Sequence, residues 1–334
     1  MESEYSSDKD RPYSPFFRLS SAAAIVILLF GEGWSSLSPS GAAGNGASEV
    51  ELASLERSLQ PLALGESSPS AAAASAEDLV RASRLAGIDP RETLTAAFPS
   101  PSEILGILSL DRDVDDFLEY ADRKDAAGDY YRAEAKVCLE LRPLRDRYEA
   151  IFATTHAALS GIVDAPPMEL GGAGRKSPYI AAPEDVWLPP RSELARSHPY
   201  ALDVFFQRVD RNGEAEKGPI IRSLYPGIVV AAAADWSGGQ GITNWKSGGL
   251  SPAAGNGVVI YDPATRKYCS YFHLYAVALR TGDIVAAGTV VGRGGNTGMN
   301  ARKAGHGEHV HIEIFDAARD ASLTAYEIRD QLKK

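Results

Sequence analysis

Apolar and polar positions follow different periods in the two halves of the chain. In residues 77–162 apolar side chains recur at the spacing of an α-helix. From about residue 201 they form short β-type runs, mostly bounded by Gly, Asp or Asn, such as GVVIYD, KYCSYFHLY and HVHIEIF. Closely spaced runs of this kind are typical of an antiparallel sheet or barrel. The pattern therefore predicts an α+β fold class, an N-terminal helical region followed by a mainly antiparallel β-sheet.

Turn residues subdivide the helical region. The segment LVRASRLAG ends at Gly87, and Pro90 and Pro101 each stand where a further helix is expected to begin. Pro143 falls inside the helical pattern. We expect a kink or break there, because proline removes a backbone donor and clashes with the preceding turn. His156 lies on one of these helices, and we expect a structural or surface role for it.

The N-terminal end carries an export-type pattern. Arg11 and Arg18 precede the uncharged run LSSAAAIVILLF at residues 19–30, whose most apolar part has the length of a signal-peptide core. The run is shorter than the ~20 residues that a membrane span needs. We therefore expect an extracytoplasmic protein (periplasm or cell envelope), with the segment either cleaved or kept as a membrane anchor. The alternative is a buried helix. No cysteine lies near the end of the run, which excludes lipoprotein attachment there.

Composition divides the chain into further segments. Two stretches rich in small, Gly and Pro residues separate the patterned regions and have the composition of linkers. The expected organisation is a signal peptide or membrane anchor at 1–35, a flexible linker at 36–76, a helical domain at 77–162, a linker at 163–188, a β-rich domain at 189–318 and a C-terminal helix at 319–334.

Charge and cysteine content narrow the class of function. The formal net charge is −10, and no long basic stretch interrupts it, so nucleic acid is not expected as a partner. The two cysteines, Cys138 and Cys269, lie far apart and form neither a metal-type pair nor a disulfide framework. We expect both to be buried free thiols.

Histidines are concentrated in the β-rich region. Five of the six lie between residues 198 and 311. In the segment HVHIEI, alternation predicts that His309 and His311 project from one face of a strand, while Val310 and Ile312 pack on the other. Two imidazoles in this arrangement can reach one metal centre. The alternative is the polar face of a half-exposed strand.

Two further segments add candidate ligands. In HPYALD, His198 and Asp203 can supply a nitrogen and an oxygen ligand to one ion, although a surface histidine near an aspartate is common. In YFHL, His273 is expected within an apolar, aromatic strand. Its alternative is a core histidine that is bonded to a backbone carbonyl.

Taken in order, these three segments resemble the lysostaphin-type (LytM-like) zinc metallopeptidases, which cleave peptide cross-bridges or stem peptides of bacterial peptidoglycan. The resemblance covers about residues 189–316. It includes the run YCSYFHLYAVALRTGDIVAAGTVVGRGGNTG and the glycine turn Gly295-Asn296-Thr297-Gly298 before HVH. The resemblance implies a peptidase domain of lysostaphin/LytM type.

The resemblance also implies a site. By its motifs, His198, Asp203 and His311 are the zinc ligands, and His273 and His309 are the two unligated catalytic histidines. Three protein ligands leave a position open for water, as in catalytic zinc sites. The implied function is that of a zinc-dependent endopeptidase (Zn²⁺ cofactor) that hydrolyses peptide bonds in peptidoglycan during cell-wall remodelling. The implied partners are peptidoglycan peptides.

Three departures from the family pattern affect this expectation. Four residues separate His198 from Asp203, where the family usually has three. One extra residue on a strand reverses the facing of its side chains, so a bulge or loop must restore the geometry. The loops RVDRNGEAEKG and WSGGQGITNWKSGGLSPAAG are long. The longer connection MNARKAGHGE contains His306, expected as a solvent-exposed loop histidine, with a fourth ligand as the alternative.

Other functions remain open from the sequence. The main alternative is a non-catalytic LytM-like regulator or scaffold that activates another cell-wall hydrolase. A sheet module that binds carbohydrate or peptide is a second, and a structural zinc site is a third. The helical region is expected to position the peptidase domain or to occlude it.

Overall fold

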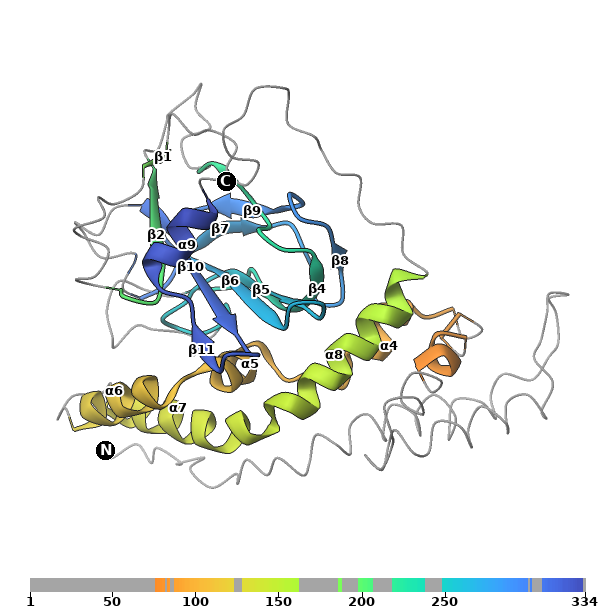
Figure 1. The fold of residues 1–334 in the computed structure, drawn as a ribbon, viewed down its shortest axis with the longest axis horizontal. Helices are drawn as coiled ribbons and strands as arrows, with labels where there is room; N and C mark the ends of the chain where they lie inside the picture. Colours follow the sequence, from red (N-terminus) through yellow and green to blue (C-terminus); the bar gives the residue numbers. More distant parts are fainter. Residues whose placement is uncertain are drawn as a thin grey trace, which may run out of the picture. The chain divides into compact units, whose positions relative to one another are not determined.

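The structure is a computed structural model that describes residues 76–81, 83–84, 87–122, 128–161, 186–187, 198–206, 218–237, 248–299, 301 and 308–332. The chain divides into two units, residues 1–97 and 98–334. Helices and strands of both units are labelled in Figure 1. The expected export segment at residues 19–30 lies outside the described residues. Within the described residues, no helix combines the length and apolar character that crossing a membrane requires.

The first unit contains helix α4 (Pro90–Thr95). Two local features explain where it starts. Asp89 Oδ1 accepts a hydrogen bond from the Arg91 amide at 3.0 Å, and Pro90 lacks an N–H group at a position where a helix has no acceptor for one. The preceding helical turns end before Gly87, which has φ = +71°. Both boundaries agree with the prediction from the sequence.

The second unit begins with a series of helices. They are α5 (Pro101–Leu108), α6 (Asp111–Ala121), α7 (Gly128–Leu141), the 3₁₀ turn η1 (Arg142–Leu144) and α8 (Arg145–Ser160). Helix α5 starts in a capping box, in which the Ser100 amide donates to Glu103 Oε2 at 2.8 Å. Pro143 lies in η1 between α7 and α8, so the predicted break is confirmed.

Two antiparallel sheets follow the helices. The larger has the order β1-β2-β10-β6-β5-β4-β8, with β11 on β10, and the smaller has the order β3-β9-β7. The strands are β1 (Val186–Trp187), β2 (Leu202–Phe206), β3 (Ile220–Arg222), β4 (Gly227–Ala233), β5 (Gly257–Asp262), β6 (Lys267–Phe272), β7 (Leu274–Val277), β8 (Ile284–Val285), β9 (Val290–Gly294), β10 (Glu308–Asp316) and β11 (Ala321–Ser322), and helix α9 (Ala325–Gln331) comes last. The predicted α+β fold with a mainly antiparallel sheet is confirmed.

Alternation along the strands builds the core of this domain. On β2, Leu202 and Val204 are buried and point to the same side as Val310 and Ile312 of β10. These side chains join a cluster of buried apolar residues that runs through β5, β6 and β9 to helix α9. The buried thiol of Cys269 lies in this cluster, and both cysteines are free, as predicted.

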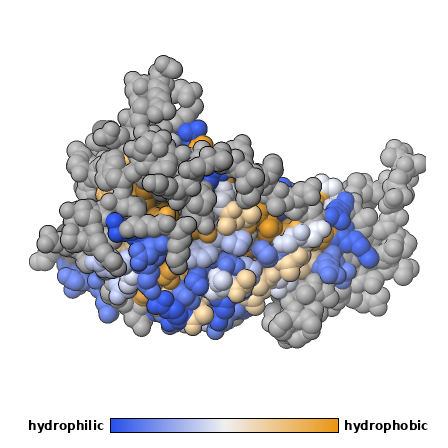
Figure 2. All heavy atoms as spheres, turned by 45° about the horizontal axis from the view of Figure 1, so that its top comes forward, coloured by the Kyte–Doolittle hydropathy of each residue, from blue (hydrophilic) through white to orange (hydrophobic). Residues whose placement is uncertain are grey.

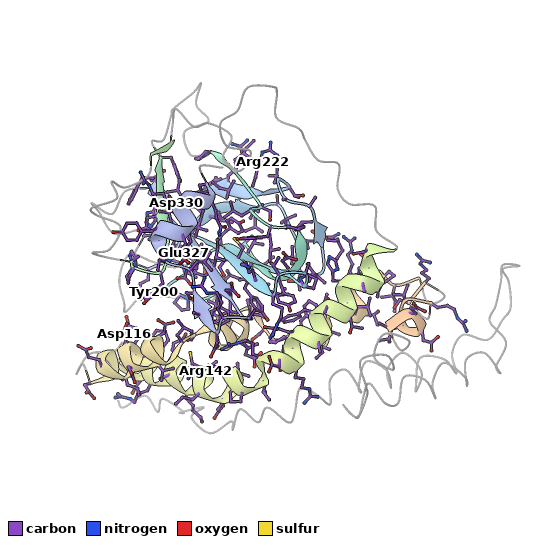
Figure 3. All side chains as sticks on the ribbon, viewed as in Figure 1. Asp116, Arg142, Tyr200, Arg222, Glu327 and Asp330 are labelled. Carbon is purple, nitrogen blue, oxygen red and sulfur yellow. The ribbon has the colours of Figure 1, made fainter. Side chains whose placement is uncertain are left out.

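The other face of the sheet is covered at one end by helix α8. Phe152, which is fully buried, contacts Tyr261 of β5 and Tyr268 of β6, with ring centroids 5.7 and 6.4 Å apart. Helices α5 and α8 both contact β4, and side chains fill the space between α8 and these strands (Figure 3). The space-filling view shows hydrophilic residues along much of the coloured lower edge, with smaller apolar areas between them (Figure 2).

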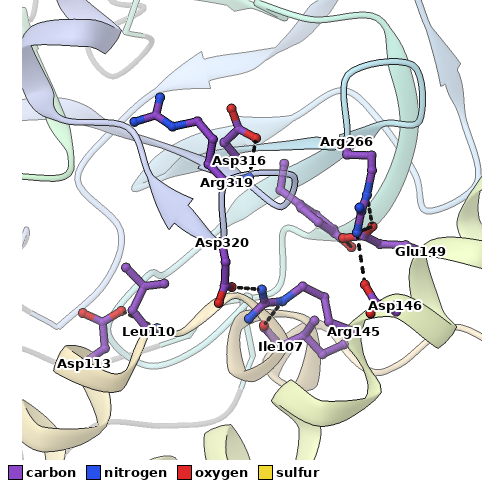
Figure 4. Close-up of polar contacts among 11 residues, drawn as sticks. Ile107, Leu110, Asp113, Arg145, Asp146, Glu149, Arg266, Asp316, Arg319 and Asp320 are labelled. Atoms are coloured by element: carbon purple, nitrogen blue, oxygen red, sulfur yellow. Dashed lines mark hydrogen bonds and ion pairs between the residues drawn. The ribbon is translucent and has the colours of Figure 1, made fainter.

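Two arginines fix α8 to the sheet through polar contacts (Figure 4). Arg145 lies 4.5 Å above the ring of Phe315, donates from Nε to the Ile107 carbonyl at 3.1 Å and pairs with Asp320. Its aliphatic stem and its charge therefore join α8, α5 and the end of β10.

The second arginine, Arg266, projects from the turn between β5 and β6. It donates to Glu149 Oε2 at 2.7 Å and to Asp146 Oδ1 at 3.0 Å, both on α8. Burial raises the pKa of Glu149 although the Arg266 guanidinium opposes the shift. Asp316, at the same end of the sheet, pairs with Lys267.

Replacement of Arg145 tests this packing. Arg145→Ala should lower the free energy of unfolding by about 2–4 kcal/mol, because it leaves a buried carbonyl without its donor and removes the cation from the Phe315 ring. The measurement is urea unfolding of the purified chain. Arg147→Ala, at an exposed position on the same helix, is the matched control and should change stability by less than about 0.5 kcal/mol. Equal stability of the two variants would contradict the account.

Candidate metal centre

The pairing of β2 with β10 places two candidate ligands opposite each other. Asp203 faces His311 across the ladder, and Phe205 faces His309. These four side chains lie on the face of the strands that points away from the apolar cluster. For His309 and His311 this is the facing that alternation predicted. His309 and His311 are both buried, so the alternative of a half-exposed polar face does not describe them.

A turn before β2 brings His198 to the same place. His198 is followed by turn residues, and the Ala201 amide donates to the His198 carbonyl at 3.4 Å. The additional residue between His198 and Asp203 therefore lies in this turn and not within the strand. The strand keeps its facing, and the expected compensation by a loop is what the structure contains.

His198, Asp203 and His311 each present one ligand atom, and these atoms all lie within 4.8 Å of one another. His311 Nδ1 is 2.7 Å from Asp203 Oδ1, and His198 Nε2 is 3.9 Å from Asp203 Oδ2. Tetrahedral ligands at ~2.0–2.2 Å from a zinc ion are separated by roughly 3.3–3.6 Å. The two separations bracket this range, and two imidazole nitrogens with one carboxylate oxygen are donors that suit zinc.

The charges in this cluster are coupled. Burial by itself raises the pKa of Asp203, but the hydrogen bond from His311 and the three surrounding imidazoles hold that pKa at about 2. Burial lowers the pKa of His311, yet the hydrogen bonds to Asp203 and Glu313 outweigh it and raise the pKa overall. The carboxylate is therefore ionised at neutral pH, which is the form that binds a metal ion.

His309 lies beside the three candidate ligands. Its Nε2 is 3.9 Å from Asp203 Oδ1, and its ring centroid is 5.0 Å from that of His273 and 5.2 Å from that of Phe205. The His309 amide donates to the Gly295 carbonyl at 3.3 Å, which connects β10 to the glycine turn. The two histidines expected to be catalytic thus lie next to each other.

The sequence pattern predicted that His273 lies within a strand. In the structure it lies instead at a bend between β6 and β7. Its backbone is left-handed, with φ = +64°, a conformation that non-glycine residues adopt rarely and often at functional sites. The bend directs the buried ring toward the rings of His309 and His311.

A hydrogen bond fixes the tautomer of His273. Nδ1 is 2.8 Å from the Thr297 carbonyl, which only accepts, so Nδ1 carries the proton and Nε2 keeps its lone pair. Burial, together with the nearby His311 and His309, lowers the pKa of His273 to about 3. The ring is therefore neutral. The bond to a backbone carbonyl that was the alternative for this residue is present, and it leaves Nε2 without a proton.

Two loops hold His273 in this position. The His273 amide donates to the Ala254 carbonyl at 3.0 Å, and Asn256 N donates to Thr297 Oγ1 at 3.0 Å. Gly298, with φ = +101°, packs against this arrangement, and a Cβ atom there would lie 2.9 Å from His273 Nδ1. The glycine turn that the sequence singled out is therefore the support of His273.

The remaining candidates lie elsewhere. His156 is half-buried on α8, where burial lowers its pKa, and it is not part of the cluster. His306 lies outside the described residues, so the alternative of a fourth ligand stays a prediction. Most of the two long loops also lies outside them.

One residue of the site was missed in the sequence. Glu313 Oε1 is 2.9 Å from His311 Nε2. The signal was present, because alternation from His309 and His311 places Glu313 on the same strand face.

The sequence model of peptidase family M23 matches residues 212–322, about a third of the chain. No curated protein matches the chain significantly. His273, His309 and His311 lie within the matched residues, whereas His198 and Asp203 precede them.

The solved structures to which the chain is similar include three bacterial peptidase structures. A variant of the catalytic domain of the prophage-encoded M23 protein EnpA from Enterococcus faecalis is 25% identical over 34% of this chain and 65% of its own, with a TM-score of 0.22. The catalytic domain of the antimicrobial peptidase lysostaphin from Staphylococcus simulans is 18% identical over 39% of this chain and 78% of its own, with a TM-score of 0.27. A zinc-containing peptidase from Vibrio cholerae is 16% identical over 37% of this chain and 48% of its own, with a TM-score of 0.19.

Residues 212–322 are similar in sequence to peptidase family M23. The resemblance to lysostaphin-type peptidases that the motifs indicated is thereby confirmed for this part of the chain.

Substitution of Gly298 tests the support of His273. Gly298→Ala should destabilise the chain by about 2–4 kcal/mol, because its φ is unfavourable for alanine and the new Cβ would meet the Ala253 carbonyl oxygen at 2.5 Å. The matched control is Gly161→Ala at the end of α8, where φ is −81° and only one atom lies within 4.0 Å of the added Cβ. The control should be neutral or stabilising by up to about 1 kcal/mol in urea unfolding. Similar losses in both variants would contradict the prediction.

Proposed function

We propose that the C-terminal domain is a zinc-dependent endopeptidase that hydrolyses peptide bonds in peptidoglycan. The observation that carries the proposal is the convergence of His198, Asp203 and His311 within 4.8 Å, next to two further histidines. The similarity of residues 212–322 to a peptidase family supports the reaction class. The lysostaphin-type motifs support peptidoglycan peptides as substrate, and the export-type pattern at residues 19–30 supports a site of action outside the cytoplasm.

The proposed ligands leave room for catalysis. His198, Asp203 and His311 would hold the zinc ion, which when bound would polarise the scissile carbonyl and acidify a water molecule. Asp203 supplies a carboxylate that is already ionised, and His311 supplies Nδ1, the ring nitrogen that faces Asp203. His198, the most exposed of the three, completes the set from the turn before β2.

The other two histidines receive separate roles in this proposal. His273 presents an unprotonated Nε2, because Nδ1 donates to the Thr297 carbonyl, so it can accept a hydrogen bond and a proton from the attacking water. His309 lies on β10, two residues before His311. We assign it to donate a hydrogen bond to the carbonyl oxygen, which becomes negative when the carbonyl is attacked. The tight support of His273 keeps its acceptor in place before the substrate arrives.

The helices of the second unit support the domain at the end away from the site. Helix α8 contacts the β5–β6 turn and the residues near Asp316, five positions along β10 from His311, or about 16 Å. The described helices therefore favour a positioning role over occlusion. A fragment that begins after α8 would expose Tyr261 and Tyr268. Whether the helical region occludes the site therefore has to be tested in the full chain.

The alternative function is a non-catalytic LytM-like regulator or scaffold that activates another cell-wall hydrolase. Zinc content separates the two, because a scaffold does not require the metal. The compact ligand set and the held tautomer of His273 favour the enzyme.

The experiment compares variants of the full chain in two measurements. Wild type should contain one zinc ion per chain by metal analysis and should release peptide fragments from purified peptidoglycan, identified by mass spectrometry. Asp203→Ala and His311→Ala should lose both properties. His273→Ala should keep zinc but lose at least about a hundredfold in hydrolysis rate, the contribution typical of an acid–base group.

His306→Ala should behave as wild type, and loss of zinc in this variant would identify it as a fourth ligand. A wild-type chain without stoichiometric zinc, or one that leaves peptidoglycan intact, would end the enzyme proposal and leave the regulator.

A further inference from the structure

Both ring nitrogens of His311 face carboxylates. Nδ1 is 2.7 Å from Asp203 Oδ1, and on the opposite side of the ring Nε2 is 2.9 Å from Glu313 Oε1. Asp203 comes from the neighbouring strand β2, whereas Glu313 lies on β10 itself, two residues after His311. The ring is thus bonded at both ends, and one of the two carboxylates is outside the candidate ligand set.

We infer that Glu313 is a positioning residue, which accepts the Nε2–H of His311 and so leaves Nδ1 as the nitrogen that binds zinc. The inference rests on the proposed function and adds a residue to it. In metal sites the nitrogen that binds the ion is set by the hydrogen bond of the other nitrogen, and a carboxylate is a frequent partner.

The packing of the ring explains why such a partner is needed. Phe272 stacks on His311 with centroids 5.8 Å apart, and His198 meets it edge-on at 5.2 Å. These contacts hold the plane of the ring but do not distinguish it from the ring turned over by 180°. A ring turned over would lose both nitrogen–carboxylate contacts, so the bond to Glu313, together with the contact to Asp203, selects the orientation in which Nδ1 faces Asp203.

Glu313 itself is placed outside the ligand cluster. Its carboxylate oxygen lies at Nε2, while Asp203 lies at Nδ1, and Glu313 is not among the described residues whose ligand atoms converge. Its side chain is 45% exposed, so it can be replaced without opening a cavity in the core. The position therefore allows a test in which folding and metal binding are separable.

The test measures zinc affinity of the full-length chain by competition with a chromophoric chelator. Glu313→Ala should weaken zinc binding by about 10–100-fold, the loss typical when the partner of a ligating histidine is removed. Glu313→Gln keeps an oxygen acceptor without its charge and should lose less than about tenfold. Glu119→Ala, exposed on α6, is the control and should bind zinc as wild type does.

A second measurement reports on the ring directly. In the zinc-loaded wild-type chain, ¹⁵N NMR of the imidazoles should show the proton of His311 on Nε2. Thermal unfolding of the metal-free variants shows whether each chain is folded.

The outcomes separate the inference from the proposed function. A wild-type chain that binds no zinc removes both. Wild-type binding with equal affinity in Glu313→Ala overturns the role of Glu313 alone. An equal loss in the alanine and glutamine variants, with both chains folded, also overturns it, because the acceptor would then not be the property that matters.

Discussion

The antiparallel pairing of β2 with β10 is the constraint on which the site depends. Its register puts Asp203 opposite His311, and the two-residue period of a strand then sends their neighbours Leu202 and Ile312 into the apolar cluster. A slip of one residue would bury the polar set and expose the apolar set, so burial of the core and assembly of the ligands specify the same register. The ionised Asp203 beside His311 adds to this pairing through charge.

Much of this arrangement was readable from local patterns, and the remainder depended on contacts distant in sequence. Alternation predicted the facing of His309 and His311, and proline and cap signals predicted the helix starts and the break at Pro143. The left-handed bend at His273 was not predictable, because it is imposed by bonds to Ala254 and to the glycine turn. Glu313 could have been found by the same alternation that identified the histidines.

The candidate metal ligands and the contacts that hold the sheet to the helices lie at different ends of the same strands. On β10 the histidines lie near one end, while at the other end Phe315 contacts Arg145 of α8 and Asp316 pairs with Lys267 of β6. A buried arginine and a buried aromatic ring hold that end without any part in the proposed reaction. The end of the sheet that packs against α8 therefore helps to fix the position of the ligands, because paired strands bend little over a few residues.

The cover that α8 provides also has a consequence for the order of synthesis. Phe152 is translated more than a hundred residues before Tyr268, which it contacts in the finished domain. At a translation rate of ~5–20 residues per second, roughly 5–25 s pass between the synthesis of Phe152 and that of Tyr268. During that interval Phe98 and Tyr148 are already available to pack on Phe152, but the side of its ring that meets the sheet still lacks Tyr261 and Tyr268.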